Sequence, residues 1–186
     1  DVRSIPFSRR LPQFNRPELE AQLPKQGVKY VFLGEELGAR RDEPEAYDGL
    51  QAAYERVAEL PAFKRGLERV MTGVSKGLSL ALLCAERDPL TCHRSVLVCR
   101  HLVNRGLDVR HIHGDGRLES QGELELRMQK ALQRLGVLEV FNGTVQLDLL
   151  GNPISSPPAS NADDQLERAY WEQGKRIAYC KPLIAA

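Results

Sequence analysis

The sequence predicts an α/β domain in which a mostly parallel, Rossmann-like sheet is flanked by helices. Residues 77–85, GLSLALLCA, form a short continuous apolar run that opens with glycine. Such a run is typical of a strand that is buried on both faces of a parallel sheet. Segments of strand composition also alternate along the chain with segments of helical periodicity, which is the pattern of an α/β fold.

The first half of the chain predicts three helices and one strand before that run. Residues 17–27, PELEAQLPKQG, begin with Pro and end with Gly, as a short helix does. Residues 28–34 are β-branched and aromatic and are expected to form a strand. The polar residues 35–44 are expected to form a loop, and apolar side chains three or four positions apart then predict helices over 45–59 and 61–74.

The same signals continue after residue 85. Cys92 is expected to begin a helix that ends near Gly106, and residues 107–114, LDVRHIHG, are expected to form one more strand. Helical periodicity then predicts helices over residues 123–135 and 164–179.

The chain is expected to form one domain with a C-terminal extension. We expect residues 1–150 to form the α/β domain, and residues 151–186 to form a linker and a C-terminal helix that packs on the same domain. Residues 152–164 are rich in Pro, Ser, Asn and Asp, which is typical of a linker. The opening DV has the composition of a strand end, so we expect a further strand and helix to precede Asp1.

Composition narrows the classes of function. A chain of 186 residues with a net charge of +1 has no overall field that would draw it to nucleic acid or to a membrane. No run approaches the roughly 18 apolar residues of a membrane helix, and no secretory signal is visible. The four cysteines are irregularly spaced, unlike a disulfide framework. We therefore expect a cytoplasmic protein without a membrane partner.

Two cysteines stand out in CAERDPLTCHR, residues 84–94. On the predicted fold Cys84 ends the central strand and Cys92 begins the next helix, so both lie in the crevice where open α/β sheets bind ligands. The amides of a helix N-terminus and the neighbouring His93 and Arg94 would favour a thiolate, so Cys92 is the candidate nucleophile or redox thiol. The alternative is that both cysteines are small core residues.

The other polar residues of this loop would bind an anion or transfer protons. Arg94, in the first helical turn, would bind phosphate or carboxylate, unless it forms an ion pair with Glu86 or Asp88. Glu86 or His93 would carry protons, or else Glu86 orients Arg94 and His93 caps a carbonyl. His111 ends the next strand of the same sheet and is expected near the loop.

A zinc site is the competing interpretation. Cys84, Cys92, His93 and His111 would supply four suitable ligands. However, C-x₇-C-H is not a standard zinc spacing, and adjacent residues rarely bind one ion. The sequence therefore predicts no metal and leaves any cofactor unidentified. A cysteine-phosphatase loop is a weaker match, because Leu90 stands where the arginine should be.

The N-terminal residues add charge near the predicted site. Asp1, Arg3, Ser4 and Arg9 follow the expected strand end and would gather at the same edge of the sheet. The arginines among them would form a basic rim around the cysteine loop, and this rim would suit a phosphate-bearing substrate. Residues 40 and 41 are arginines as well, and for these we expect solvated surface positions.

Four motifs, DVRSIPFSR, LGEELG, CAERDPLTCHR and HI, occur in this order within roughly residues 1–115. Together they resemble domain of unknown function 488. The resemblance implies a strand and a helix before the first motif, and its cysteine motif implies enzymatic activity without an established reaction. Carried over to this sequence, the recurrent polar residues of the family are Asp1, Arg3, Ser4, Ser8, Arg9, Cys84, Glu86, Cys92, His93, Arg94 and His111.

The sequence therefore predicts an enzyme that acts on a phosphate-bearing small molecule or nucleic acid. Cys92 or Cys84 would react, Glu86 or His93 would carry protons, and the substrate would be bound by Arg94, Arg3, Asp1, Ser4, Ser8, Arg9 and His111. The alternatives are an anion- or nucleic-acid-binding module without catalysis and a metal-binding regulatory protein. The oligomeric state stays open.

Overall fold

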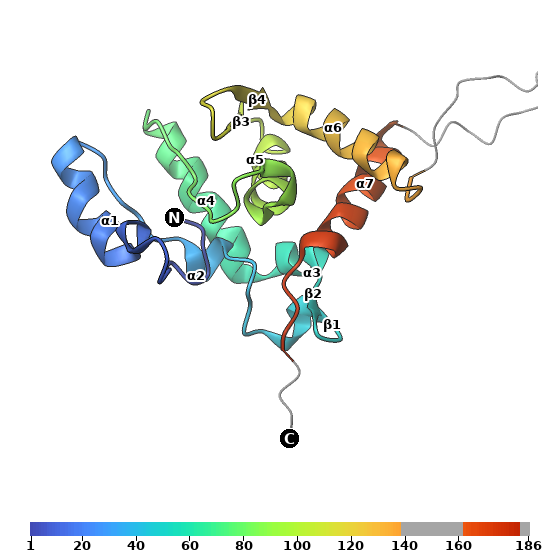
Figure 1. Ribbon diagram of the computed structural model, residues 1–186, viewed down its shortest axis with the longest axis horizontal. Coiled ribbons are helices and arrows are strands. Elements are labelled where there is room, and N and C mark those ends of the chain that lie inside the picture. Colours follow the sequence, from blue (N-terminus) through green and yellow to red (C-terminus); the bar gives the residue numbers. More distant parts are fainter. Residues whose placement is uncertain (139–161, 183–186) are drawn as a thin grey trace, which may run out of the picture.

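Helices dominate the computed structural model, which describes residues 1–138 and 162–182 (Figure 1). None of the helices in these two ranges is long and apolar enough to cross a bilayer. The helical elements are η1 (Pro12–Phe14), α1 (Arg16–Gln22), η2 (Leu23–Gln26), α2 (Gly34–Leu37), η3 (Pro44–Ala46), α3 (Tyr54–Glu59), α4 (Pro61–Ser75), η4 (Pro89–Thr91), η5 (Arg94–Cys99), α5 (Arg100–Val103), α6 (Gln121–Arg134) and α7 (Ala162–Ile177).

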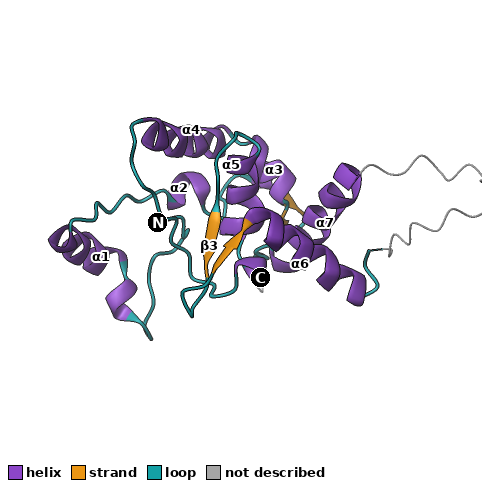
Figure 2. Ribbon diagram, turned by 90° about the horizontal axis from the view of Figure 1, so that it is seen from above, coloured by secondary structure: helices purple, strands orange, loops and turns teal. Residues whose placement is uncertain are grey.

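The strands of the described residues form two short antiparallel pairs. β1 (Tyr47–Asp48) pairs with β2 (Gln51–Ala52), and β3 (Arg110–Ile112) pairs with β4 (Leu118–Ser120). Figure 2 shows how small the β3–β4 hairpin is beside the helices around it. The prediction of a mixed helix and strand fold is confirmed, but the mostly parallel Rossmann-like sheet is wrong for the part of the chain that the structure describes.

Three segments lie where that sheet was expected, and few backbone hydrogen bonds join them. They are the chain around Asp1, around Val31 and around Leu83. The Asp1 nitrogen donates to the Val31 carbonyl (2.8 Å), and the Leu33 amide donates to the Asp1 carbonyl (2.9 Å). The Val2 amide donates to the Leu83 carbonyl (3.0 Å), whereas the Val2 carbonyl contacts a ring nitrogen of His93 (3.1 Å). The His93 side chain thus occupies the Val2 carbonyl, which a longer run of strand pairing would need as a hydrogen-bond acceptor.

The prediction of a central strand over residues 78–84 is also wrong. This segment is extended, but Leu78 is 56% and Leu80 is 46% exposed, so it is not buried on both faces. A continuous apolar run shows that a segment is hydrophobic without showing what covers it. The cysteines therefore do not lie in the crevice of a parallel sheet. The candidate site is defined instead by the contacts between their side chains and the neighbouring ones.

Most of the predicted helices are present. The helix over 61–74 is α4, the helix over 123–135 is α6, and the helix over 164–179 is α7. The helix over 17–27 is divided into α1 and η2. The expected strand 107–114 is shorter than predicted, as β3.

The predicted helix over 45–59 is wrong in its first half. Residues 47–52 form the hairpin β1–β2, and only α3 is helical after it. Gly49 sits in the turn with φ of +58°, a conformation that favours glycine. The two-residue loop of the hairpin is Gly49-Leu50, and glycine in the first loop position is a typical hairpin signal that here outweighs the helical spacing of the apolar residues.

The loop expected over 35–44 is present at residues 38–43, but the short helix α2 forms at its start. Gly34 and Gly38 face the N-terminal segment, and a Cβ atom on either would collide with Arg3 or Ser4. The two glycines therefore let residues 3 and 4 lie directly against α2. This contact fixes the N-terminal segment beside the loop that carries the cysteines.

The core lies between α2, α4, η5 and the two long C-terminal helices. Phe63 and Leu67 of α4 are almost completely buried, as are Leu132 of α6 and Ala169 of α7. α7 packs against α6, α3 and η5, which places it beside the middle of the molecule (Figure 1). Most of the linker expected over 152–164 lies outside the described residues.

Candidate functional site

The two thiols of the CAERDPLTCHR loop meet at one carboxylate. The Cys84 Sγ donates to Glu86 Oε2 at 2.9 Å, and the Cys92 Sγ donates to the same oxygen at 3.2 Å. The Cys84 Sγ also lies 3.4 Å from Nδ1 of His93. The four donor atoms all lie within 4.8 Å of one another. We call Cys84, Glu86, Cys92 and His93 the Cys-Glu-Cys-His cluster.

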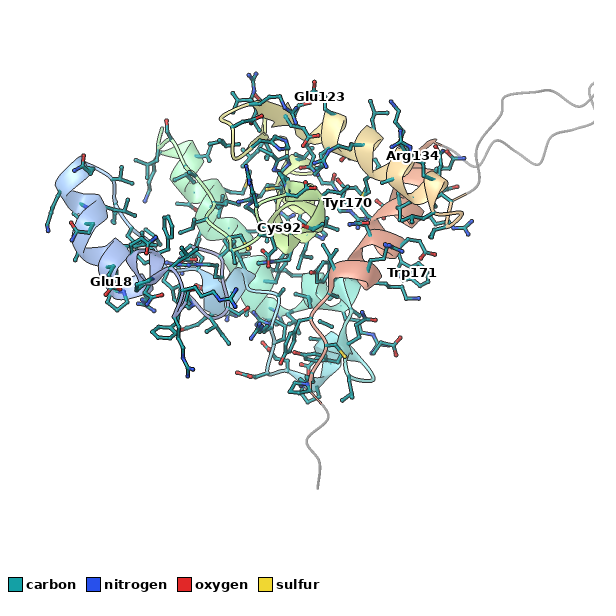
Figure 3. All side chains as sticks on the ribbon, viewed as in Figure 1. Glu18, Cys92, Glu123, Arg134, Tyr170 and Trp171 are labelled. Carbon is teal, nitrogen blue, oxygen red and sulfur yellow. The ribbon has the colours of Figure 1, made fainter. Side chains whose placement is uncertain are left out.

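Local backbone structure brings the two ends of the loop together. Asp88 caps η4 by accepting the Leu90 amide (3.0 Å), and Pro89 starts that helical turn. The Cys92 carbonyl then accepts the Val96 amide (3.1 Å), so Cys92 immediately precedes the helical turns of η5. The chain reverses at η4, and Cys92 therefore returns to Cys84. Figure 3 shows Cys92 near the middle of the molecule.

The backbone of the N-terminal segment orients His93. Nε2 of His93 lies 3.1 Å from the Val2 carbonyl. A carbonyl oxygen only accepts, so Nε2 carries the proton that it donates to Val2. In the neutral imidazole, Nδ1 then has a free lone pair directed at the Cys84 thiol.

The charges within the cluster influence one another. Burial opposes the charge on Glu86, but hydrogen bonds from the Cys84 and Cys92 thiols outweigh it and lower the pKa of the carboxyl. The neighbouring Cys92 thiol, and after it burial, raise the pKa of the Cys84 thiol. Burial also opposes charge on His93, but its contacts with Cys84, Val2 and Glu86 outweigh it and raise the pKa of the imidazole.

A pocket of about 220 Å³ opens over one side of this cluster. Cys84 lines the pocket, whereas Cys92 does not and is completely buried. The remaining lining residues are Arg3, Ser4, Ile5, Ala39, Arg40, Tyr54, Ala85, Glu86, Thr91, His93, Ile177 and Tyr179. The thiol that a small molecule can reach is therefore Cys84.

Arg40 brings an exposed cation to the pocket. Its guanidinium lies over the Tyr179 ring, 4.6 Å from the ring centroid, and no carboxylate of the described residues pairs with it. Its backbone amide donates to Ser4 Oγ (2.9 Å). Arg41 is buried instead and binds Glu43, so the expectation of a solvated surface position is wrong for Arg41.

The N-terminal polar residues are largely occupied by one another. Arg3 lines the pocket, but its guanidinium binds both carboxylate oxygens of Asp1, at 2.9 and 2.6 Å. The Asp1 carboxylate also accepts the Tyr30 hydroxyl (2.7 Å). These contacts fix the segment that presents Ser4 and the Val2 carbonyl to the site.

Five of the predicted substrate-binding residues lie outside both the cluster and the pocket lining, and Asp1, which pairs with Arg3, is one of them. Ser8 Oγ accepts the Leu11 amide in a local turn, and Arg9 is exposed. Arg94 is half-buried at the start of η5. Nε2 of His111 lies 2.6 Å from Gln121 Oε1, in a buried contact.

Several pocket residues were not expected from the sequence, and three of them come from distant segments. Tyr54 of α3 had the spacing of a core residue, and Ile177 and Tyr179 belong to the C-terminal helix and the chain that follows it. Nothing in the local sequence links these residues to the cysteine loop. The tertiary packing of α3 and α7 brings them there.

Cys84, Glu86, Cys92 and His93 are also the residues that could hold a metal ion. This set differs from the one considered from the sequence, because Glu86 takes the place of His111. Two sulfurs, one oxygen and one nitrogen form a donor set that suits zinc.

Comparisons with known proteins give one match. The model of the family described as Domain of unknown function DUF488 matches residues 1–100, which include the whole cluster. Neither the curated proteins nor the solved structures contain a match to the chain.

Proposed function

The chain belongs to the DUF488 family, and from this premise we propose that it is an enzyme whose substrate is a phosphate-bearing small molecule. The observation that carries the proposal is that one pocket is lined by a thiol, Cys84, and by an exposed guanidinium, Arg40. A reactive group and an anion receptor in the same small cavity are what such a reaction requires.

Cys84 takes the role that the sequence suggested for Cys92. It is the thiol of the cluster that a bound molecule can reach, while Cys92 is sealed in the interior. Contact with Cys92 and burial raise the pKa of the Cys84 thiol, so it needs a base in direct contact to lose its proton. Glu86 and His93 both contact its sulfur, and His93, whose pKa is raised, is the stronger base of the two. The Cys84 sulfur would then attack the phosphorus of the substrate. The bond from phosphorus to the leaving oxygen would break, and the proton taken from the thiol would pass to that oxygen.

Arg40 takes the role of anion receptor. Guanidinium groups bind phosphate oxygens through paired hydrogen bonds, and a neighbouring aromatic ring restricts their motion. Arg3 instead supports the pocket wall through Asp1. The cavity of about 220 Å³ suits a compact ligand, so a small phosphate compound is favoured over nucleic acid. Four free cysteines are consistent with a cytoplasmic location, which we propose as well.

Alkylation of the cysteines tests where the anion binds. The protein is treated with iodoacetamide with and without inorganic phosphate, and modification of each cysteine is followed by peptide mass spectrometry. Phosphate should slow modification of Cys84 by about tenfold at ten times its Kd. The exposed Cys180 should react equally in both samples and serves as the internal reference.

Arg40→Ala should abolish this protection, whereas Arg9→Ala, at an exposed site outside the pocket, should retain it. Protection that persists in Arg40→Ala would show that phosphate does not bind at Arg40. Turnover is then sought with nucleotides and sugar phosphates, comparing wild type with Cys84→Ser. Phosphate binding without turnover of any compound would leave a binding module as the function.

A further inference from the structure

We propose that Cys84, Glu86, Cys92 and His93 bind one zinc ion. The four side chains come from a stretch of ten residues, yet the structure gathers a donor atom from each into one small volume. The inference does not depend on the proposed reaction, because a protein without turnover would also bind the ion.

Three of the six separations between the donors are slightly shorter than or equal to those of a tetrahedral site, and all six are at most 4.8 Å. Zinc–sulfur bonds of about 2.3 Å and zinc–nitrogen or zinc–oxygen bonds of about 2.1 Å place tetrahedral donors roughly 3.3–3.8 Å apart. The observed separations are 2.9 Å from Cys84 to Glu86, 3.2 Å from Cys92 to Glu86 and 3.4 Å from Cys84 to His93. Small side-chain rotations would open the cluster around an ion.

The contact between His93 and Val2 is the arrangement that metal-binding histidines use. Their second ring nitrogen usually donates to a carboxylate or a backbone carbonyl, which fixes the ring and directs the free lone pair at the metal. In this protein Nε2 contacts the Val2 carbonyl, and Nδ1 faces the other donors. His93 is also only 8% exposed, so the orientation of its ring is restricted by packing.

The donor types select zinc. Thiolate sulfur disfavours magnesium and calcium, which require oxygen, and the mixed set of two sulfurs, one nitrogen and one oxygen suits tetrahedral zinc. On binding, the Cys84 and Cys92 thiols release their two protons to solvent, and His93 stays neutral. Two thiolates and one carboxylate around a divalent ion leave one negative charge on the site.

The spacing that argued against zinc in the sequence is explained by the fold. Cys92 and His93 are adjacent, but Cys92 lies before the first turn of η5, and His93 turns back toward the N-terminal segment. The reversal at η4 supplies Cys84 and Glu86 from the other side of the loop. Adjacent residues can therefore reach one ion.

The four donors differ in exposure, so one side of the site faces the protein interior and the other faces the pocket. Cys92 and His93 are buried, whereas Glu86 is exposed and lines the pocket with Cys84. The ion would lie at the pocket floor, with the carboxylate as its most replaceable ligand. A bound ion would also hold the Cys84 sulfur as a thiolate. Glu86 and His93 would then be ligands, so the proton transfer of the proposed reaction belongs to the zinc-free protein.

Metal binding by the full chain tests the inference directly. The purified protein is stripped with a chelator and reconstituted with zinc, and the metal content is measured after removal of excess ion. We expect one zinc per chain. Cobalt in place of zinc should give the strong visible absorption of a tetrahedral site and sulfur-to-cobalt charge-transfer bands. Wild type that retains no zinc, or a weak octahedral cobalt spectrum, would overturn the proposal.

Variants then identify the ligands. Cys92→Ser and His93→Ala should weaken zinc binding by about a hundredfold or more, and Glu86→Ala should weaken it less, since water can replace the carboxylate. Cys99→Ser is the matched control, a buried cysteine outside the cluster that should bind normally. Circular dichroism of each zinc-free variant verifies folding. Normal binding in a folded Cys92→Ser would contradict the proposed ligand set. Zinc binding without turnover would contradict only the proposed reaction.

Discussion

At the scale of single residues, two glycines hold the N-terminal segment in place. Gly34 and Gly38 lie where the chain at Arg3 and Ser4 crosses α2, and either would collide with that chain if it carried a side chain. The contact matters for the site because the Val2 carbonyl of the same segment binds His93. Glycine is used here for close approach of two backbone segments.

We expect Gly34→Ala to lower the free energy of unfolding by about 3 kcal/mol, the upper range for overpacking a buried position. The new methyl group would meet the Arg3 carbonyl and the Phe32 ring, and a backbone atom cannot rotate away. Urea unfolding measures the change. Gly122→Ala in α6 is the control: it meets nothing and should stabilise the helix by about 0.5 kcal/mol. Equal stabilities for the two variants would contradict the close approach.

The residues of the cluster could be predicted from the sequence because they lie in one short loop. Any fold that reverses the chain between Cys84 and Cys92 brings them together. Arg94 and His111 were predicted through the edge of a parallel sheet that the described residues do not form. Arg40 and Tyr179 depend on tertiary packing, which local composition does not report.

At the scale of elements, one ion-pair network joins the β3–β4 hairpin to α6 and to the cysteine loop. Glu119 of β4 accepts from Arg127 Nε (2.8 Å) and contacts His113 Nε2 (2.8 Å). Arg127 also donates to Asp88, which caps η4 (2.9 Å). The network therefore connects the conformation of the loop to the hairpin and the helix behind it.

The stability supplied by Glu119 should depend on pH. Burial opposes its charge, but hydrogen bonds from Arg127 and His113 outweigh it and lower the pKa of the carboxyl below its ordinary value of 4.5. A folded-state pKa below the unfolded one stabilises the protein above pH 4.5, and this contribution is lost as the pH falls through the folded-state pKa. Glu119→Gln should therefore cost about 2 kcal/mol near pH 6, as expected for hydrogen bonds to a charged group.

The measurement is urea unfolding of wild type and Glu119→Gln from pH 7 to pH 3. The difference between the two should shrink below pH 4.5. Glu68→Gln is the control, because Glu68 is exposed on α4 and its side chain has no hydrogen-bond partner among the described residues. A difference that stays constant down to pH 3 would mean that the charge of Glu119 contributes nothing.

The elements themselves show which sequence signals are sufficient. The helices α4, α6 and α7 were predicted because their apolar residues repeat over four turns or nearly so. The segment 45–59 has the same spacing over a shorter stretch, and the turn at Gly49 and Leu50 interrupts it. Residues 77–85 have no periodicity, so their exposure depended on neighbours that the sequence did not identify.

At the scale of the whole molecule, the C-terminal helix is part of the pocket and of the core. The family match ends at residue 100, yet α7 contributes Ala169 and Tyr170 to the core and Ile177 to the pocket. Gln173 of α7 donates to the Leu90 carbonyl of the cysteine loop (2.7 Å). These contacts favour a single cooperative domain, which remains a prediction.

Unfolding followed by two probes tests this prediction. The single tryptophan, Trp171, is in α7, so its fluorescence reports that helix, while far-ultraviolet circular dichroism reports all helices. If α7 folds with the rest of the chain, both signals should change at the same urea concentration, as two-state unfolding requires. Ala169→Glu, which buries a charge against the core, should shift both midpoints down together by an amount equivalent to about 3 kcal/mol or more. Arg168→Glu, at a neighbouring exposed position, should shift neither. A fluorescence transition that precedes the circular dichroism transition would show that α7 detaches first, and the pocket wall it supplies would then be an independently folding addition to the family domain.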